Sequence, residues 1–443
     1  MQGVARSVES GIGVPVRILL VAHRYPPDGV GGVERYVERL GLELRRRGER
    51  THVLTRTPRR LPRRPRLERK DGVYRIVGSG VRLREFLLEH EAVERAFGEV
   101  LAEVRPDIVH VNHLIGISPK IVALARRAEI PVVLSIHDYY VACPLVHLVK
   151  ADGRLCDGPD GGRECAATCF ADEGAAADRW TIRSEYFAEL LQIASAVVCP
   201  TERLAGFLRP MAPRASFEVI GLGVPAARGS AAPPSSDRLT LAHVGTASRH
   251  KGVFRILAAI ERAVLGDIHL LVLGRFVTTR ERREFINAAA GVPGLTLELG
   301  GEFDPAALPQ LLGGVTAVIA ASEVPEAFPL APREALAVGV PVLAARLGGL
   351  VDVIEPEVNG VLFEPRSTEA LAQAIRRVVV EPGLQTRLAA GARSTDVPTF
   401  AAHVDALSDI YRRVIAGVGV RSVDSFDQLH AEALAAGFGQ RDR

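Results

Sequence analysis

The chain has 443 residues, of which 47% are hydrophobic and 24% charged, and its formal net charge at pH 7 is +3. This length predicts two domains of roughly 200 residues each, and the nearly balanced charge gives no indication of nucleic-acid binding. No apolar run approaches the roughly 18–20 residues that a membrane span requires. The first apolar stretch, residues 16–22, is short and leads into a glycine loop, so we expect a strand there and not a signal peptide. We therefore expect a cytoplasmic protein with reduced cysteines.

Strand and helix patterns alternate from residue 16 onward, which favours parallel α/β units. Residues 1–14 are aperiodic and are predicted to be a loose N-terminus. The predicted strands of the first half are 17–22, 51–55, 107–111, 132–136 and 195–200, and those of the second half are 238–245, 270–274, 315–320 and 340–345. Between the halves, a stretch rich in Pro, Gly, Ala and Ser predicts a linker at 223–237. The sequence thus predicts an α/β protein with two doubly wound, Rossmann-like domains, at 15–222 and 238–399.

The most informative segment is ASEVPEAFPLAPREALAVGVPVLAARLGGL, residues 321–350. Glu326 and Glu334 are separated by seven residues and lie on either side of a turn between a predicted strand and a predicted helix. Open α/β sheets bind ligands just beyond the carboxyl ends of their strands, and a helix N-terminus is a ready anion site. A simpler reading, an acidic residue that complements the helix dipole, explains Glu334 alone. It does not explain the whole order of strand, Glu, turn, Glu, helix and Gly-Gly loop.

This order resembles the donor-binding segment of retaining GT-B-fold glycosyltransferases of family four (glycosyl transferases group 1), where E-x7-E is followed by a small-residue helix, G-x-PV and a GG loop. The resemblance implies two domains that face each other across a cleft, the first binding an acceptor and the second a nucleotide-sugar donor. It also implies that the helical run 400–416 crosses back onto the first domain, which leaves 417–443 as a tail.

The resemblance assigns roles within this segment. Glu334 would hold the ribose hydroxyls, and Glu326 would hold sugar hydroxyls or steady the oxocarbenium-like charge. The backbone N–H groups of Leu330 and Ala331 would face the phosphates, with Phe328 in the same donor-binding turn. Pro329 stands where the family commonly has Gly and offers no N–H.

Two further motifs agree with this family. Residues 23–40 form a glycine loop in which Gly31 and Gly32 precede a helix at the place of the family's GG-x-E loop. The spacing differs from the dinucleotide fingerprint and suits a phosphate that approaches from the opposite domain; the alternative is a mobile glycine turn at a helix cap.

The second motif is HVGTASRHKGVFRIL, residues 243–257, which follows the family's G-R-x4-K-G pattern through Gly245, Lys251 and Gly252. In that pattern the basic residues neutralise the phosphates of the leaving nucleotide. Thr246 stands where Arg is usual, which leaves Arg249 or Arg275 to supply the missing charge. A surface lysine is the alternative reading of Lys251.

His137 and Asp138 directly follow a predicted strand, where the family has a His that faces the donor sugar near the reacting carbon. We therefore name both as candidate catalytic residues, with Asp138 orienting the His137 ring; a structural hydrogen-bonding His is the alternative. His110, Asn112 and His113 end the neighbouring strand and are weaker candidates on the acceptor side.

Four cysteines, Cys143, Cys156, Cys165 and Cys169, lie in one Gly- and Asp-rich insertion, residues 143–170. Four thiols on a loop too polar to pack its own core are consistent with a structural zinc site. Only the last pair has the short spacing usual for such sites, so four separate thiols are the alternative. The fifth cysteine, Cys199, lies inside a strand pattern and is expected in the core.

Residues 45–69 contain eleven arginines, including Arg59, Arg60, Arg63 and Arg64. Such a charge run is usually a solvated loop, but it would also be attracted to an anionic membrane surface or to a pyrophosphate-bearing lipid. This would make the protein peripheral at the inner face of the membrane. No aromatic residues interleave the arginines, which disfavours nucleic acid as a partner.

Taken with the resemblance, these motifs predict a retaining transfer from a UDP-, GDP- or ADP-sugar to a hydroxyl of a glycan or lipid-linked saccharide, as in cell-envelope or exopolysaccharide synthesis. The chain contains no Asp-x-Asp metal clamp, so we expect no cofactor to be required for catalysis. A nucleotide-sugar epimerase of GT-B build and a non-catalytic zinc-binding scaffold are the alternatives. The missing dinucleotide fingerprint disfavours an oxidoreductase.

Overall fold

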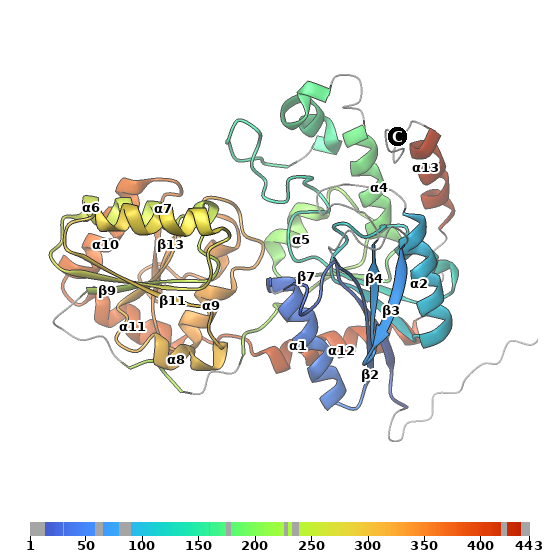
Figure 1. Cartoon of the computed structure of the whole chain (residues 1–443), viewed down its shortest axis with the longest axis horizontal. Coiled ribbons are helices and arrows are strands. Elements are labelled where there is room, and N and C mark those ends of the chain that lie inside the picture. The colour runs from blue at the N-terminus through green and yellow to red at the C-terminus, as the bar shows by residue number, and fades with distance from the viewer. Residues whose placement is uncertain are drawn as a thin grey trace, which may run out of the picture.

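The computed structural model describes residues 14–29, 31–57, 65–78, 90–158, 160–173, 179–225, 229–232, 239–417 and 423–435, and the structural statements below concern these residues. They form two α/β domains that lie side by side (Figure 1). Each domain is built on its own sheet, and the two sheets follow one another along the chain. The predicted pair of Rossmann-like sheets is confirmed.

The first sheet contains eight strands in the order β3-β4-β2-β1-β5-β6-β7-β8. These are β1 (Arg17–Val21), β2 (Arg50–Arg56), β3 (Arg66–Lys70), β4 (Val73–Val77), β5 (Ile108–Val111), β6 (Val132–Ser135), β7 (Ala196–Cys199) and β8 (Phe217–Val219). All neighbours pair in parallel except β3 with β4. Every residue of β5, β6 and β7 is buried, as expected for parallel strands covered on both faces.

The second sheet contains six parallel strands in the order β11-β10-β9-β12-β13-β14. These are β9 (Leu239–Val244), β10 (Ile268–Leu273), β11 (Leu295–Gly301), β12 (Ala317–Ala320), β13 (Val342–Ala345) and β14 (Gly360–Phe363). The strand order reverses between β9 and β12, and this switch point is where doubly wound sheets bind ligands.

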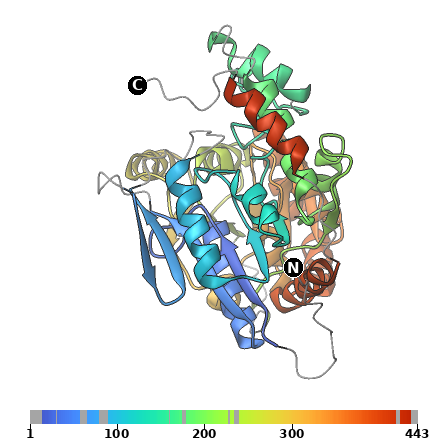
Figure 2. The ribbon, with the colours of Figure 1, turned by 90° about the vertical axis from the view of Figure 1, so that its right-hand side faces the viewer.

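Helices cover both sheets, and Figure 2 shows α2 in front of the strands of the first domain. The helices are α1 (Gly32–Arg46), α2 (Glu91–Val104), α3 (Ile121–Arg127), α4 (Arg179–Ile193), α5 (Glu202–Leu208), α6 (Val253–Ala263), α7 (Thr279–Ala290), α8 (Leu308–Leu311), α9 (Leu330–Ala337), α10 (Thr368–Val380), α11 (Leu384–Ser394), α12 (Phe400–Ala416) and α13 (Asp424–Ala435). None of the helices within the described ranges has the length and apolarity needed to cross a membrane.

The nine predicted strands are present, each within about two residues of its expected ends. Strands β3, β4, β8, β11 and β14 were not predicted from the sequence. Strand β3 (Arg66–Lys70) falls in the arginine-rich segment, where charge suggested a loop. It forms the exposed edge of the first sheet, a position where charged side chains are common because they discourage pairing with another chain.

Helix α12 follows the second domain in sequence but packs on the first, as Figure 1 shows beside α1. The chain passes between the domains beside Val224, which forms an isolated parallel bridge with Thr399. Two buried hydrogen bonds then fix the helix: Tyr36 Oη to His403 Nε2 at 2.7 Å, and Tyr411 Oη to His110 Nδ1 at 2.6 Å. His110, a weaker acceptor-side candidate, is therefore engaged in this structural contact.

The segment 417–443 is more than the tail that the sequence suggested, because part of it forms α13 against α4. The Phe426 side chain is fully buried, and its ring lies 4.8 Å from that of Tyr186. This burial of an apolar face on the first domain explains why a short helix with little sequence signal is formed.

Candidate functional site

A cavity of about 490 Å³ lies between the two domains, at the carboxyl ends of β9 and β12 and facing the start of α1. It is therefore at the switch point of the second sheet. The sequence-predicted residues that line it are Gly31, Gly32, His137, Gly245, Lys251, Glu326, Phe328, Leu330, Ala331 and Glu334. The three predicted motifs thus meet at one cavity, although they lie far apart in the sequence.

The turn after β9 brings Lys251 to this cavity because of two glycines. Gly245 and Gly252 both have positive φ, +113° and +75°, which favours glycine. A Cβ on Gly252 would lie 1.9 Å from the backbone oxygen of Ala321. Only glycine lets this turn approach the end of β12 so closely, and the approach places Lys251 Nζ 2.5 Å from Glu326 Oε2.

The Gly-Gly loop after β13 holds the turn that carries Glu326. A Cβ on Gly348 would lie 2.7 Å from the backbone nitrogen of Glu326. The neighbouring Gly349 donates its N–H to the backbone oxygen of Glu326 at 2.7 Å. The glycines of the motif therefore serve to pack this loop against the acidic turn.

Glu334 lies in the second turn of α9 and not at the helix start, which corrects the sequence reading. Burial raises the pKa of the Glu334 carboxyl above its usual value, and the positive charges of Arg39 and Arg35 oppose this shift. Both arginines belong to α1 of the first domain and line the same cavity. Charge is therefore complementary across the cleft.

Pro329 caps the N-terminus of α9 with an extended backbone, so the first helical residues are Leu330 and Ala331. Both line the cavity. Their N–H groups belong to the first turn of the helix, where no intrahelical acceptor is available to them. This end of α9 therefore offers donors to an anion in the cavity.

Of the two arginines left to replace the missing motif Arg, only Arg275 lines the cavity. Its side chain is 55% exposed. Arg249 instead forms an ion pair with Glu284 at 2.7 Å and stacks on the Phe254 ring, so the structure does not place it with the donor residues. The side chain of Arg249 points away from the cavity, and the spacing of residues in the sequence could not reveal this direction.

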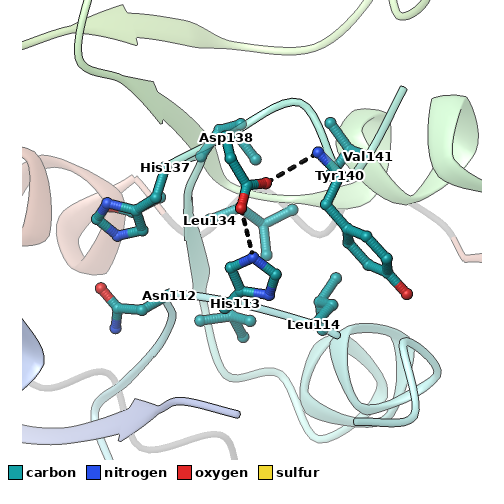
Figure 3. A pocket seen from close by; sticks show the side chains of 11 residues that line it. Asn112, His113, Leu114, Leu134, His137, Asp138, Tyr140 and Val141 are labelled. Atoms are coloured by element: carbon teal, nitrogen blue, oxygen red, sulfur yellow. Dashed lines mark hydrogen bonds and ion pairs between the residues drawn. The ribbon is translucent and has the colours of Figure 1, made fainter. Parts of the chain in front are cut away.

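His137 and Asp138 point in different directions, as Figure 3 shows. Asp138 accepts hydrogen bonds from His113 Nε2 and from the backbone N–H of Tyr140, both at 2.9 Å. It therefore orients the ring of His113 and not that of His137, contrary to the sequence expectation. Burial would raise the pKa of Asp138, but electrostatic interaction with His113 and these hydrogen bonds hold it at about 2.

His137 turns toward the main cavity, where its ring makes an edge contact with Tyr36, with 4.8 Å between centroids. Burial lowers the pKa of the His137 imidazole to about 3, so the ring is neutral at physiological pH. Its Nε2 atom has no hydrogen-bond partner among the described residues. A neutral ring with an available nitrogen suits contact with a hydroxyl group.

A second cavity of about 310 Å³ adjoins the first and shares five residues with it: His137, Thr246, Lys251, Glu326 and Phe328. Its other walls come from both domains. Asp138 and His147 belong to the first domain, and Ser248 and His250 to the second. The Ser248 hydroxyl is fully buried and has no hydrogen-bond partner among the described residues. This cavity offers a second polar compartment at the Glu326 end of the donor cavity.

Several lining residues of the main cavity were missed by the sequence analysis: Arg35, Tyr36, Arg39, His243, Glu302 and Phe303. Arg35 and Arg39 carried a usable signal, because residues four apart lie on one face of a helix. Glu302 and Phe303 follow β11, a strand that the sequence did not reveal.

The cysteines and the described part of the arginine-rich segment do not line this cavity. Among the described residues, no group of three or more His, Cys, Asp or Glu side chains stands ready to hold a metal ion, so the zinc site stays a prediction. Arg59, Arg60, Arg63 and Arg64 lie outside the described residues. The described arginines of that segment are partly neutralised: ion pairs join Arg47 to Asp405, Arg66 to Glu68, and Arg69 to Glu99 and Glu103.

Two family profiles match the chain: Glycosyltransferase Family 4 over residues 30–228 and Glycosyl transferases group 1 over residues 230–395. The first match covers the first sheet except β1, and the second spans the second sheet with its E-x7-E turn. The chain therefore belongs to glycosyltransferase family 4 and is a glycosyltransferase of the GT-B fold. This membership does not favour the epimerase or the scaffold alternative.

Similar proteins agree with this assignment. A glycogen synthase from Mycobacterium tuberculosis is 26% identical over 408 residues, which cover 85% of this chain and 89% of that protein. A D-inositol 3-phosphate glycosyltransferase from Catenulispora acidiphila is 29% identical over 416 residues, 87% of this chain and 92% of that protein. The structure of the Anabaena protein HepE, in complex with UDP and glucose, matches the fold with a TM-score of 0.59 at 16% identity, covering 95% of this chain and all of that one.

Proposed function

We propose that the protein transfers a sugar from a nucleotide-sugar donor to a hydroxyl acceptor with retention of anomeric configuration. The observation that carries the proposal is the meeting of Lys251, Glu326 and Glu334 around one cavity at the switch point of the second sheet. The relatives are named as glycosyltransferases or synthases, and HepE was solved with UDP and glucose. Both are consistent with a UDP-, GDP- or ADP-sugar as donor.

In this proposal the donor diphosphate lies between Lys251, Arg275 and the N-terminus of α9, whose charges offset its own. Glu334 holds the ribose hydroxyls. Glu326 lies at the other end of the cavity, where it holds sugar hydroxyls or stabilises positive charge at the anomeric carbon. The residues of the chain thus supply the charge that the phosphates need, and transfer is expected to persist at early times in EDTA.

The reaction exchanges one glycosidic bond for another. The bond from the anomeric carbon to the phosphate oxygen breaks, and the acceptor hydroxyl bonds to the same face of that carbon. The departing phosphate takes the proton of this hydroxyl, so neither Glu326 nor Glu334 has to act as a covalent nucleophile, unlike the usual pair in retaining glycosidases. His137 contacts a hydroxyl of the sugar near the reacting carbon. Closure of the cleft excludes water, which would otherwise hydrolyse the donor.

We place the acceptor, a glycan or a lipid-linked saccharide, in the second cavity. It adjoins the donor cavity at Glu326 and His137, where the anomeric carbon would lie. Its polar walls, with Asp138, Ser248 and His250, suit a hydroxyl-rich molecule. The relatives named here act in different syntheses, so the acceptor must be found by assay.

We also propose a cytoplasmic protein whose arginine-rich segment contacts anionic membrane. Changing Arg59, Arg60, Arg63 and Arg64 to Ser should reduce binding to anionic vesicles at low salt and leave turnover with a short water-soluble acceptor intact. Equal vesicle binding by the parent and the quadruple variant would mean that the segment has no such role.

The proposed donor class is tested by thermal unfolding with a panel of UDP, GDP and ADP sugars. One of them should stabilise the protein, by about 2.7 kcal/mol at roughly 100 times its dissociation constant. Incubation of this donor without and with candidate acceptors then separates transfer from epimerisation, which needs no acceptor. A protein that no nucleotide sugar stabilises would contradict the proposal.

A further inference from the structure

The cysteine-rich insertion folds around its first thiol. The Cys143 side chain is buried, and its sulfur accepts hydrogen bonds from the backbone N–H groups of Leu145 and Leu148. Val146 and Leu148 have positive φ, +72° and +51°, which is costly for branched and bulky residues. The backbone thus curls so that its N–H groups point at the sulfur. Burial raises the pKa of the Cys143 thiol, and these N–H groups oppose that shift.

The other three cysteines follow Cys143 within the same insertion. Cys156 donates its backbone N–H to the carbonyl of Leu148 at 2.9 Å, which ties it to the turn around Cys143. Cys165 and Cys169 are the two ends of a single π-helical turn, a feature frequent at functional sites. Burial raises the pKa of the Cys165 thiol to about 12, and electrostatic interaction with the other three thiols adds to this shift.

A positive charge lies beneath this cluster. The Arg183 guanidinium, on α4, is fully buried and donates to the backbone carbonyls of Tyr140 and Val141, just before the insertion. It interacts favourably with the thiols of Cys143 and Cys165. Nearby cations favour thiolates, so the charge of Arg183 opposes the effect of burial on the pKa of these two thiols.

The same insertion crosses to the second domain. We call residues 144–155 the strap. Its His147 ring stacks on that of His250, with 5.4 Å between centroids, directly beside Lys251. At its tip, the carbonyl of Gly153 accepts a hydrogen bond from Arg366 at 2.5 Å, and Leu155 packs against the core of the second domain. The thiols therefore lie at the base of a segment that reaches the donor site.

We propose that Cys143, Cys156, Cys165 and Cys169 bind one Zn²⁺ ion as thiolates, and that this ion holds the strap against the second domain beside Lys251. A set of four thiolates is typical of zinc in structural sites. Binding releases four thiol protons to solvent and leaves a complex of charge −2, part of which Arg183 offsets. The second half of the proposal rests on the proposed donor role of Lys251, whereas the first half is independent of it.

The described side chains do not form a finished ion cage, so the ion has to draw the four sulfurs together. Metal binding is then coupled to ordering of the insertion. This coupling gives the proposal two separate readouts, the metal content of the protein and the protection of its backbone.

Metal content tests the site directly. The full-length protein, incubated with zinc under reducing conditions and dialysed, should retain about one zinc per chain. Cys156→Ser and Cys169→Ser, which change partly exposed thiols, should each weaken zinc affinity at least tenfold. Cys199→Ser is the matched control, because Cys199 is a buried thiol in β7, and it should retain the metal. The proposed site would be wrong if the parent protein failed to retain zinc, or retained iron with sulfide in its place. Equal retention of zinc by the Cys156→Ser variant and the parent would also contradict it.

Cobalt binding distinguishes loss of the metal site from misfolding of a variant. Co²⁺ added to the folded metal-free protein should produce the thiolate-to-cobalt absorption of a tetrahedral site, and the Cys169→Ser variant should lose it while its circular dichroism is unchanged. Absence of this absorption in the parent counts against the site.

Hydrogen exchange tests the strap. Zinc should slow exchange at least tenfold in residues 144–156 and also at 248–252, in the turn that carries His250 and Lys251. His147→Ala should abolish protection at 248–252 and keep it at 144–156. Protection that is confined to residues 144–156 in the parent protein would contradict the proposed contact of the strap with the second domain. Neither result depends on whether the protein transfers a sugar.

Discussion

Lys251 Nζ lies 2.5 Å from Glu326 Oε2, although 75 positions separate the two residues in the chain. The ion pair joins the glycine turn after β9 to the acidic turn after β12, so two sequence motifs form one site. The two side chains are 34% and 17% exposed, which leaves Lys251 accessible from the cavity. A bound diphosphate would compete with Glu326 for this lysine.

Lys251→Met is therefore expected to weaken donor binding. Loss of a charge-assisted contact to phosphate should cost about 1.5–3 kcal/mol, or roughly a 10- to 150-fold increase in the dissociation constant. Isothermal titration calorimetry with the preferred nucleoside diphosphate measures this change in the dissociation constant. Lys120→Met is the control, because Lys120 pairs with Glu94 in the first domain, 3.7 Å away, and should change affinity little. Equal affinities of the Lys251→Met variant and the parent would remove Lys251 from the phosphate site.

Glu334→Gln should weaken donor binding without destabilising the fold at neutral pH. Burial raises the pKa of Glu334 in the folded protein, so the folded state binds this proton more tightly than the unfolded state. The resulting stabilisation is fully present below the unfolded pKa and is lost as pH rises through the folded pKa. At pH 7 the buried carboxylate thus gives no such benefit, and the variant should unfold in urea at the same or a higher concentration. Clear destabilisation at pH 7 would contradict this account.

The same shift predicts how donor affinity depends on pH. If the ionised Glu334 accepts the ribose hydroxyls, affinity should fall as pH drops through a pKa above the 4.5 of an ordinary glutamate. The Glu334→Gln variant should lack this acidic limb. A limb of the same midpoint in both proteins would assign the titration to another group.

His137 should contribute no titration between pH 5 and 8. Its pKa of about 3 keeps the imidazole neutral over this range, unlike a solvent-exposed histidine, which titrates near pH 6.5. His137→Ala should therefore lower kcat by a similar factor at pH 5.5 and at pH 8. A defect that disappears at one end of this range would show that His137 acts in its charged form.

Arg39 and Glu334 should be energetically coupled across the cleft. The charges of the two side chains interact, and both line the donor cavity. In a double-mutant cycle with Arg39→Met and Glu334→Gln, donor affinity should show a coupling of about 0.5–3 kcal/mol. Arg46→Met, on the same helix with a side chain that is 80% exposed, should show none. Additive effects of Arg39→Met and Glu334→Gln would mean that the two domains act independently on the donor.

Local sequence patterns predicted the two sheets, and most of the site residues named from the motifs line the donor cavity. The glycines were especially informative, because Gly252 and Gly348 occupy positions where a Cβ would collide with backbone. Side-chain direction was not predictable in the same way. Arg249 belongs to the correct turn but pairs with Glu284 on its outer side, and Asp138 pairs with His113 and not with His137. Spacing along the chain gives the position of a residue, whereas its partner depends on segments that only the tertiary fold brings near.

Contacts between the domains were also hidden from the sequence. Arg35 and Arg39 face Glu334 because α1 of the first domain lies opposite α9 of the second. Similarly, helix α13 is weakly patterned, and it forms because Phe426 is buried against α4. Such contacts depend on the relative placement of distant elements, for which a single sequence carries little information.

The anomeric configuration of the released sugar distinguishes a retaining transfer from an inverting one. In the absence of acceptor, slow hydrolysis of the preferred nucleotide sugar can be followed by proton NMR before the free sugar mutarotates. The first sugar released should have the configuration of the donor, and Lys251→Met should slow its release. First release of the opposite anomer would contradict the retaining mechanism, and equal rates for the parent and Lys251→Met would contradict the proposed site.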